Sequence, residues 1–313
     1  MTYRPRISVC MLSYNHEKFI VQAVESALAQ HGEFDLQIVI GDDASKDATP
    51  ILLQQLQSRF PGQIKLRLNA ANVGMMQNMQ STLAECTGDF IAMLEGDDYW
   101  TDPGKLEKQL AVMQAHPDAA ICFHPVQILE NDSFVPDRFT KEVPAITSIT
   151  DLSQGNYMHT CSVMYRAGLV EGLPASIANS TVGDYFLHML YAQHGSIHKL
   201  PDVMAVYRVH SGGVWSSHKD IDKKVLQYLS CMIGCFDEQV NATMIKRYNG
   251  IAVRVFMNEL GSDADAANLK RCLAYDNAQL LNALATLARE NAQYKKSFVG
   301  RTMRALQSLA GAR

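Results

Sequence analysis

The feature that most constrains the fold is a regular alternation of short apolar runs and helix-like patterns over the first 125 residues. Short apolar runs are typical of buried strands, and apolar residues three and four apart are typical of helices. Strands are expected at residues 7–12, 36–40, 64–68, 90–94 and 119–123, and helices at residues 19–29, 47–60, 74–84 and 103–115. This alternation requires right-handed crossovers, so the sequence predicts an α/β fold: a mainly parallel, Rossmann-like sheet flanked by helices.

Polar residues follow three of these strands at the point where each strand ends. Tyr14 follows the first strand, Asp42 the second and Asp97 the fourth. In parallel sheets, ligands bind beyond the carboxyl ends of the strands. We therefore expect these residues along one rim of the sheet, which makes that rim the candidate functional site.

The strongest local signal is an acidic cluster directly after a buried strand. It reads Glu95-Gly96-Asp97-Asp98-Tyr99-Trp100. Neighbouring carboxylates repel one another unless a cation neutralises them, and Mg²⁺ and Mn²⁺ prefer carboxylates together with phosphate oxygens. The alternative is a solvated acidic segment before the next helix, but Asp102 and Pro103 already supply a start for that helix. The metal interpretation is therefore favoured.

Other candidate residues have plain structural alternatives. Asp184 begins an apolar helix and would serve there as an N-cap. His210 precedes a pair of glycines, which suit a loop that closes on a ligand, yet a single histidine is more often structural. Arg208 suits a phosphate, although an exposed arginine needs no special role. His159 and Thr160 are polar residues in an apolar stretch, and we expect them on the acceptor side of the site.

Composition excludes several classes of protein. The formal net charge of −4 argues against a nucleic-acid-binding protein. Apolar residues make up 47% of the chain, enough for a sizeable core. No stretch reaches the roughly 18 to 20 apolar residues of a membrane span, and residues 1–6 do not resemble a secretory signal. A cytoplasmic protein is expected, with the inner face of the membrane as its further possible location.

The second half of the chain is less regular. Residues 126–151 suggest a loop region with prolines, followed by strands at residues 161–165 and 203–210 and a helix at residues 183–194. From residue 220 the pattern is helical, so we place a boundary near residue 219. Residues 293–313 carry an apolar stripe beside basic residues. This stripe predicts contact with an anionic membrane surface, or else docking on the protein itself or on a second copy.

Taken in order, several of these segments resemble family-two glycosyltransferases with the GT-A fold, over about residues 6–215. The matching segments are Ser13-Tyr14-Asn15 after the first strand, Asp42-Asp43-Ala44-Ser45-Lys46-Asp47, Asn72-Val73-Gly74, Glu95-Gly96-Asp97-Asp98-Tyr99-Trp100, Gly183-Asp184 and Tyr207-Arg208-Val209-His210. The resemblance implies a GT-A domain at residues 1–219, with a nucleotide-sugar half to about residue 125 and an acceptor half at 126–219, followed by a helical region at 220–313.

The resemblance also implies a role for each matching residue. Those that would bind the nucleotide are Ser13, Tyr14, Asn15, Asp42, Asn72 and Gly74. Asp97 and His210 would bind Mn²⁺ or Mg²⁺, while Asp98 and Arg208 would contact the donor sugar and diphosphate. Asp184 would be the general base.

The sequence departs from the family pattern in two places. Glu95 replaces the usual first aspartate of the metal motif, and Gly183 replaces a carboxylate before Asp184. This combination resembles a bacterial subgroup that builds surface polysaccharides. The expected function is therefore inverting, non-processive transfer of one sugar, with a UDP-sugar as the default donor and a glycan or lipid-linked acceptor.

Two other functions stay open. A sugar nucleotidyltransferase shares the fold style and the acidic metal site, but it needs a glycine-rich phosphate loop after the first strand. The segment from Ser13 to Glu17 contains no glycine. The second alternative is a nucleotide-sugar-binding protein without catalytic activity, which the presence of Asp97, Asp98 and Asp184 disfavours.

Overall fold

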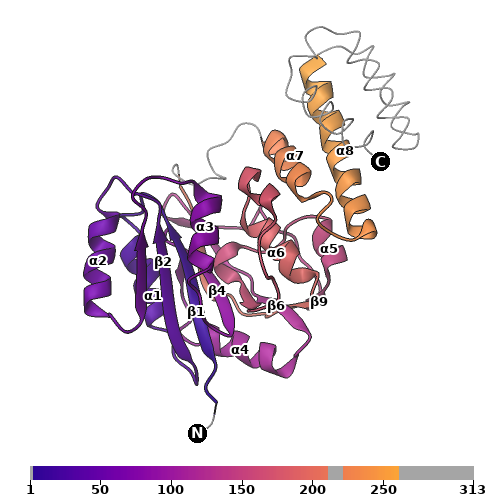
Figure 1. Ribbon diagram of the computed structural model, residues 1–313. Helices are drawn as coiled ribbons and strands as arrows, with labels where there is room; N and C mark the ends of the chain where they lie inside the picture. Colours follow the sequence, from indigo (N-terminus) through magenta and orange to yellow (C-terminus); the bar gives the residue numbers. More distant parts are fainter. Residues whose placement is uncertain (1–2, 211–220, 261–313) are drawn as a thin grey trace.

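The computed structural model describes residues 3–210 and 221–260, built around an eight-stranded sheet of order β3–β2–β1–β4–β10–β6–β11–β9 (Figure 1). β10 and β9 are antiparallel to their neighbours, and the other strands are mutually parallel. The strands are β1 (Arg6–Ser13), β2 (Asp35–Asp42), β3 (Ile64–Leu68), β4 (Phe90–Glu95), β6 (Ala119–Phe123), β9 (Ile146–Thr147), β10 (Met164–Arg166) and β11 (Ser196–Lys199). The predicted α/β fold with a mainly parallel sheet is confirmed.

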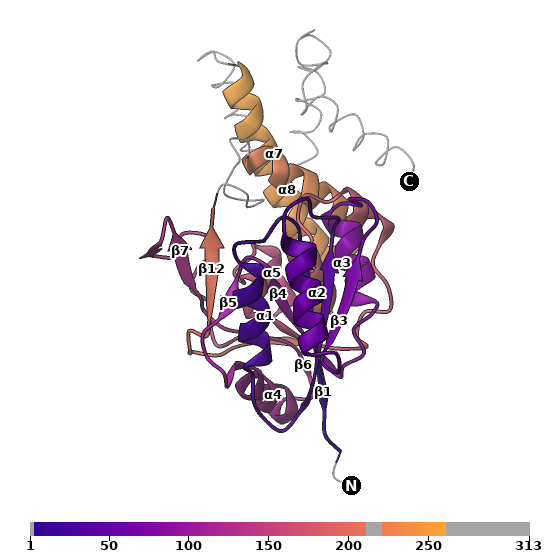
Figure 2. The ribbon, with the colours of Figure 1, turned by 90° about the vertical axis from the view of Figure 1, so that its left-hand side faces the viewer.

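Different helices bury the two faces of this sheet. They are α1 (Ile20–Leu28), α2 (Thr49–Arg59), α3 (Met75–Leu83), α4 (Lys105–Ala115) and α6 (Asp184–Ala192). Side chains alternate between the faces of a strand. Accordingly, Val9 and Met11 of β1 pack in the cluster of α1, α2 and α4, whereas Cys10 packs in the cluster of α3 and α6. With helices on both faces, ligands reach the sheet at its strand ends (Figure 2).

A second, four-stranded sheet lies beside the first, in the order β5–β12–β7–β8. Its strands are β5 (Tyr99–Trp100), β12 (Ala205–Val209), β7 (Gln127–Glu130) and β8 (Ser133–Val135). The expectation of a loop region at residues 126–151 was therefore wrong, since β7, β8, β9 and the helix α5 (Ile149–Ser153) all fall there. These elements are too short to display a period. β7 and β9 are fixed by pairing with the distant strands β12 and β11, and β8 forms a hairpin with β7.

Two local expectations also need correction. The strand expected at residues 161–165 begins instead with a 3-10 turn, η1 (Thr160–Ser162), and β10 starts only at Met164. Both the amide and the hydroxyl of Ser162 donate to the His159 carbonyl, which closes the turn. Asp47 is not the N-cap of α2, because that position is Ala48. The Asp47 carboxylate instead accepts the amides of Thr49 and Glu17, each at 3.0 Å.

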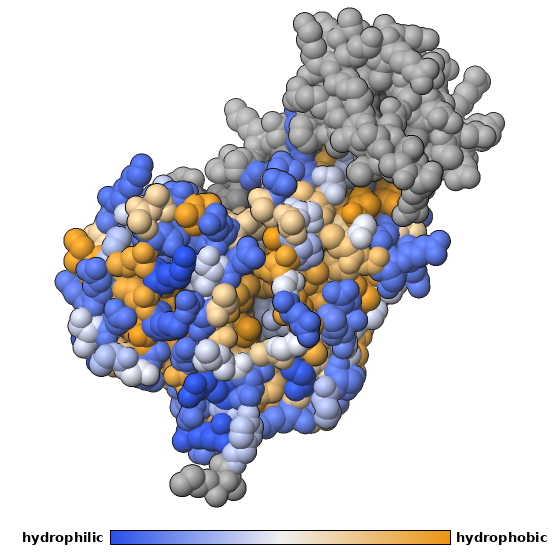
Figure 3. All heavy atoms as spheres, in the orientation of Figure 1, coloured by the Kyte–Doolittle hydropathy of each residue, from blue (hydrophilic) through white to orange (hydrophobic). Residues whose placement is uncertain are grey.

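The chain continues into α7 (Ile221–Met232) and α8 (Glu238–Leu260), as the prediction of C-terminal helices required. Both helices are bonded to the segments around α6: Gln227 donates to the Asn179 carbonyl, and Arg247 donates to the Tyr185 hydroxyl at 2.8 Å. Apolar residues gather around α6 and α7 on the face shown in Figure 3. No helix in residues 3–210 and 221–260 has the length and apolar character to cross a membrane. The predicted stripe at residues 293–313 lies outside the described residues.

Candidate active site

The carboxyl ends of β1, β2 and β4 form one rim of the large sheet. In the pairing register, Ser13 lies opposite Asp42, and Leu12 lies opposite Glu95. The segments that follow these strands therefore meet at the same edge, and they carry most of the residues singled out in the sequence. β12 of the second sheet runs past this edge and adds Tyr207 and Arg208, and His210 directly follows the strand.

Two buried aspartates organise the loops at the expected nucleotide end of the rim. Asp42 accepts the amide of Ser45 at 3.0 Å and the hydroxyl of the same residue. Asp43 accepts the amides of Val73 and Gly74 at 2.8 and 2.9 Å. Asp43 therefore holds the loop before α3 against the end of β2. No role was predicted for Asp43, whose only signal in the sequence was its place beside Asp42.

Asn72 and Gly74 belong to this held loop. The Asn72 amide donates to the Asp43 carbonyl oxygen at 3.2 Å. Gly74 adopts a φ of +87° and a Cβ there would meet nothing within 4 Å, so backbone conformation and not crowding favours glycine. Both residues lie near the end of β2, where a base or ribose would be bound.

The loop after β1 is joined to the loop after β2. Asn15, at a φ of +57°, donates its amide to the Ser45 hydroxyl and accepts the Lys46 amide, each at 2.8 Å. Tyr14 is 41% exposed, and the buried Ser13 hydroxyl has no hydrogen-bond partner in the described part of the chain. The exposed Tyr14 is therefore available to a ligand, the Ser13 hydroxyl is buried beneath the rim, and the Asn15 side chain mainly connects the two loops.

Asp97 forms the centre of the acidic cluster. Its Oδ2 lies 2.9 Å from His210 Nε2 and 3.7 Å from His16 Nε2. Burial raises the pKa of Asp97, but the hydrogen bond with His210 and the charge of His16 outweigh burial and leave the pKa below its ordinary value. The preceding Gly96 is required, because a Cβ there would lie 2.8 Å from His16 Nδ1 and from Ile20 Cδ1. Asp97 is thus an ionised carboxylate beside two imidazoles.

The two carboxyls beside Asp97 are buried and incompletely paired. Asp98 Oδ1 accepts the Arg208 amide at 2.8 Å, while Asp98 Oδ2 and Glu95 Oε2 have no hydrogen-bond partner among the described residues. Burial, followed by the Asp97 carboxylate, raises the pKa of Asp98 well above its ordinary value. Burial and the Asp98 and Asp97 carboxylates do the same to the pKa of Glu95. The cluster holds more negative potential than its neighbours neutralise.

This arrangement fits a divalent cation bound jointly with a phosphate ligand. Among residues 3–210 and 221–260, no three His, Cys, Asp or Glu side chains are placed to hold a metal alone. Mg²⁺ is usually held by only one or two carboxylates together with substrate phosphates, so a complete protein cage is not needed. Asp97 and His210, whose side chains are partly exposed, would hold such an ion. The ion would neutralise the charge of the Asp98 and Glu95 carboxyls, which have buried oxygens without a hydrogen-bond partner among the described residues.

Arg208 lies beside this cluster but faces protein groups. Its guanidinium donates to the Asp97 carbonyl oxygen and to Gln22 Oε1, and it lies 4.4 Å from the ring centroid of Tyr99 and 5.0 Å from that of Phe19. These contacts brace the backbone of Asp97. A diphosphate contact by Arg208, as expected from the sequence, stays a prediction and requires the guanidinium to leave Gln22.

Asp184 lies across the cluster at the start of α6. Its Oδ2 accepts the Thr160 hydroxyl at 2.9 Å, and its Oδ1 accepts the Tyr185 amide at 2.7 Å. Gly183 is packed against α3, where a Cβ would lie 2.8 Å from Met76 Cε. The structure therefore brings Thr160 and Asp184, which are 24 positions apart in the sequence, into direct contact.

His159 occupies a setting that the sequence did not suggest. Its Nε2 lies 2.9 Å from Asp137 Oδ2, and its ring lies 4.8 Å from that of Tyr207 and 6.2 Å from that of Phe139. Burial raises the pKa of Asp137, but its hydrogen bonds with His159 and Thr140 outweigh burial, so the pKa is lowered. Asp137 and Phe139 fall in the stretch expected to be a loop, and no sequence pattern marked them.

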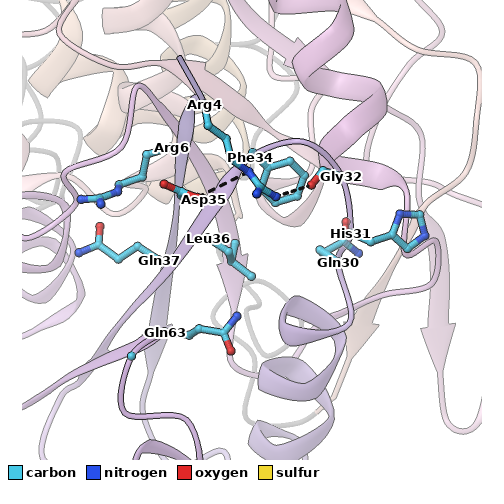
Figure 4. Close-up of a pocket in the computed structure, with 11 residues that line it drawn as sticks. Arg4, Arg6, Gln30, His31, Gly32, Phe34, Asp35, Leu36, Gln37 and Gln63 are labelled. Atoms are coloured by element: carbon cyan, nitrogen blue, oxygen red, sulfur yellow. Dashed lines mark hydrogen bonds and ion pairs between the residues drawn. The ribbon is translucent and has the colours of Figure 1, made fainter. Parts of the chain in front are cut away.

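A separate cavity of about 640 Å³ lies at the opposite ends of the strands (Figure 4). It is lined by the beginnings of β1 and β2, including Arg6 and Leu36, and its one acidic side chain, Asp35, lies 3.6 Å from Arg4 Nε. None of the sequence-predicted site residues lines it. Its chemistry does not match the carboxylate cluster, so the rim is the candidate active site.

Comparisons with known proteins agree on family and fold. The family model described as "Glycosyl transferase family 2" matches residues 8–173, which are 166 of the chain's 313 residues. "Uncharacterized protein Rv1520" of Mycobacterium tuberculosis is 37% identical over 217 residues, covering 67% of this chain and 61% of that protein. The chain thus spans about three fifths of the length of this relative.

Two solved structures share the fold. S. aureus TarS 1–349, in complex with UDP-GlcNAc, has a TM-score of 0.60 at 20% identity and covers 89% of this chain and 79% of its own. The mannosyltransferase PcManGT from Pyrobaculum calidifontis, in complex with GDP-Man and Mn²⁺, has a TM-score of 0.63 at 19% identity, with 97% and 85% covered. The likeness is one of fold, and the predicted GT-A-type architecture is confirmed.

Proposed function

Because the chain belongs to glycosyl transferase family 2, we propose that it moves a single sugar from a nucleoside diphosphate sugar to a hydroxyl acceptor, with inversion at the anomeric carbon. The observation that supports this most is that two different groups of side chains lie on the same rim. Asp97 with His210 lies on one side, and Asp184 with Thr160 lies on the other. A leaving diphosphate and an attacking hydroxyl need groups of these two kinds.

On the diphosphate side, Asp97 and His210 would hold Mn²⁺ or Mg²⁺. A divalent cation supplies stabilisation of the negative charge that builds on a leaving diphosphate. Asp98 and the Oε2 atom of Glu95 are buried behind these two residues, and because the pKa of each carboxyl is raised, a bound cation would favour their ionised forms. Asp98 also fixes β12 through the Arg208 amide, which holds His210 within reach of Asp97.

On the acceptor side, Asp184 would remove the proton from the attacking hydroxyl. The Thr160 hydroxyl and the Tyr185 amide each use one acceptor position of its carboxylate and fix its orientation. Each carboxylate oxygen keeps a second lone pair for the acceptor. A general base typically contributes about 10²- to 10⁴-fold to the rate. One displacement without a covalent intermediate inverts the configuration.

On the nucleotide side, Ser13, Tyr14 and Asp42 with the loop held by Asp43 would bind the base and ribose. TarS was solved with UDP-GlcNAc and PcManGT with GDP-Man. These ligands support a nucleoside diphosphate sugar for this chain, with a UDP-sugar as the first donor to test. A glycan or lipid-linked acceptor in surface polysaccharide synthesis, reached at the inner face of the membrane, completes the proposal.

The direct test incubates the purified full chain with UDP-, GDP- and dTDP-sugars and Mn²⁺, and measures release of the nucleoside diphosphate. We expect one nucleotide class to be hydrolysed slowly without acceptor. A sugar nucleotidyltransferase would instead consume a nucleoside triphosphate with a sugar phosphate and release pyrophosphate. A protein without catalytic activity would bind a donor and release nothing, and either result would overturn the proposal.

A further inference from the structure

Three aromatic side chains meet on the acceptor side of the rim. Tyr207 on β12 lies 4.8 Å from the ring of His159 and 5.9 Å from that of Phe139. The His159 side chain is buried, whereas Phe139 is 41% exposed. We call Phe139 and Tyr207 the aromatic platform. The proposed reaction has not used either residue so far.

The segment that carries Phe139 is fixed from several directions. Asp137 accepts the Phe139 amide at 2.8 Å and contacts buried His159. Arg138 is paired with Glu130 by two hydrogen bonds of 2.6 and 2.8 Å, and it lies 4.9 Å from the centroid of the Phe139 ring. A large apolar side chain is thus held at the surface by a set of specific polar contacts. Aromatic side chains are enriched at binding surfaces, so this fixed ring, in contact with Tyr207, is a candidate ligand contact.

The platform adjoins the proposed base. His159, which contacts Tyr207, directly precedes Thr160, and the Thr160 hydroxyl donates to Asp184. Tyr207 directly precedes Arg208, whose amide donates to Asp98. The Tyr207 ring is therefore placed between the residues of the acceptor side and those of the diphosphate side.

The Tyr207 hydroxyl is available for a ligand. It has no hydrogen-bond partner within residues 3–210 and 221–260, and it is not among the fully buried polar atoms that lack one. Burial raises the pKa of Tyr207, and the carboxylates of Asp98 and Glu95 raise it further, so the hydroxyl stays protonated near these groups. It can donate one hydrogen bond and accept another.

We propose that Phe139 and Tyr207 bind a pyranose ring of the acceptor, with the ring's apolar C–H face against the aromatic side chains and the Tyr207 hydroxyl bonded to one of its hydroxyls. This inference rests on the proposed glycosyl transfer and narrows its acceptor to a sugar. A cyclic sugar matches a flat apolar surface flanked by hydroxyl and carboxylate groups. A phosphate-bearing polyol would need a cation, and Arg138 is already paired with Glu130.

The test is saturation-transfer-difference NMR on the full chain with UDP and Mg²⁺ present. Methyl β-D-glucopyranoside and methyl α-D-mannopyranoside are the probes, and ribitol is the acyclic comparison. We expect saturation of the aromatic protons to reach the ring C–H hydrogens of a pyranoside and not those of ribitol. Phe139→Ala should weaken pyranoside binding about threefold to tenfold, the range expected for loss of one aromatic contact.

Phe134→Ala is the matched control, because Phe134 is 59% exposed on β8 and has no ring contact with the platform among the described residues. It should bind the pyranoside as the unchanged protein does. Tyr207→Phe keeps the ring and should retain ring saturation while lowering affinity through loss of the hydroxyl. The UDP signals in each sample report that the variant is folded.

Three results would overturn the inference: equal pyranoside binding by the unchanged protein and Phe139→Ala, equal binding of ribitol, or no pyranoside binding while UDP binds. These failures are separate from failure of the proposed function. The latter would appear as absence of donor hydrolysis and does not depend on Phe139.

Discussion

The nucleotide and acceptor sides of the rim are held by different kinds of contact. On the nucleotide side, carboxylates bind backbone amides: Asp43 holds the amides of Val73 and Gly74, and Asp42 holds that of Ser45. On the acceptor side, the contacts between distant segments join side chains, as between His159 and Asp137 and between Thr160 and Asp184. The backbone amides that Asp137 and Asp184 accept lie within three positions of each carboxylate. Contacts to backbone amides fix the path of a loop, whereas a pair of contacting side chains can be replaced by other residues without a change in the backbone. Under the proposed function, acceptor preference would therefore change while the donor site stays constant.

The largest effect is expected from Asp97→Ala, because Asp97 faces His210 and would share the cation with it. Loss of a Lewis-acid site worth several kcal/mol corresponds to a fall of about 10³- to 10⁵-fold in kcat/KM. Glu95→Gln, which preserves volume, should cost much less. Donor turnover measured over a Mn²⁺ titration separates the two variants. Full turnover after exhaustive chelation would contradict the metal requirement.

Asp184→Asn should lower transfer to an acceptor about 10²- to 10⁴-fold, since the base acts on the acceptor hydroxyl. Donor affinity should change little, because Asp184 lies on the other side of the rim from the nucleotide loops. Thr160→Val is the matched control, which removes the orienting hydroxyl and keeps the carboxylate. If Asp184→Asn retains kcat and loses only about 1 kcal/mol of stability, the residue is a helix-end group and not the base.

Asp43→Ala tests the backbone contacts of the nucleotide side. It removes three hydrogen bonds to a buried carboxylate, from Val73, Gly74 and Asn69. We expect about 3 kcal/mol lower stability by urea unfolding and a donor KM raised about tenfold or more, with kcat at saturation nearly unchanged. Asn72→Ala loses a single bond of 3.2 Å and should change KM far less. Equal donor KM values for both variants would show that Asp43 does not shape the donor site.

The same contrast explains what the sequence could predict. Strands such as β1 and helices such as α1 are long enough to display their periods in the sequence. Each polar cluster at the proposed nucleotide end of the rim directly follows its own strand, so the position of that cluster could be predicted. β8 has three residues and β9 two, too few to display a period, and β9 is fixed by pairing with β11, about 50 positions further along the chain. Asp137 is 22 positions from His159, and Asp97 is 113 from His210. The glycine pair after His210 was its only local signal, and its metal role came from the resemblance to known proteins. Tyr207 lay in a matching segment without a role, and nothing pointed to Asp137 or Phe139.

A buried lysine that no sequence pattern marked lies behind the turn η1, which carries Thr160. Lys105 of α4 is fully buried, donates to Gln109 Oε1 at 2.7 Å and lies 4.1 Å from the Trp100 ring centroid. Gln109 in turn donates to the carbonyls of Cys122 and Ser162, each at 2.9 Å, which connects α4 to β6 and to η1. Burial lowers the pKa of Lys105 to about 7, against weak opposing effects of the nearby Cys161 and Cys122 thiols.

The smallest effect is expected from Lys105→Met, as a change in how stability depends on pH. Below pH 7 the lysine is protonated in both the folded and the unfolded chain, so the cost of burying its charge is present in full. Between pH 7 and its ordinary value of 10.5, the unfolded chain binds more protons than the folded chain, and stability rises with pH. The rise in stability between pH 7 and pH 9 amounts to about 2 kcal/mol, from a folded pKa near 7 and 1.36 kcal/mol per unit.

His124, which also lies near Lys105, has its pKa lowered to about 3 by burial and then by Lys105, so it stays neutral across this range. Urea unfolding of the unchanged protein and of Lys105→Met at pH 7, 8 and 9 measures the difference. We expect the variant to lose this rise, and an identical rise in both proteins would show that Lys105 is not the group that titrates.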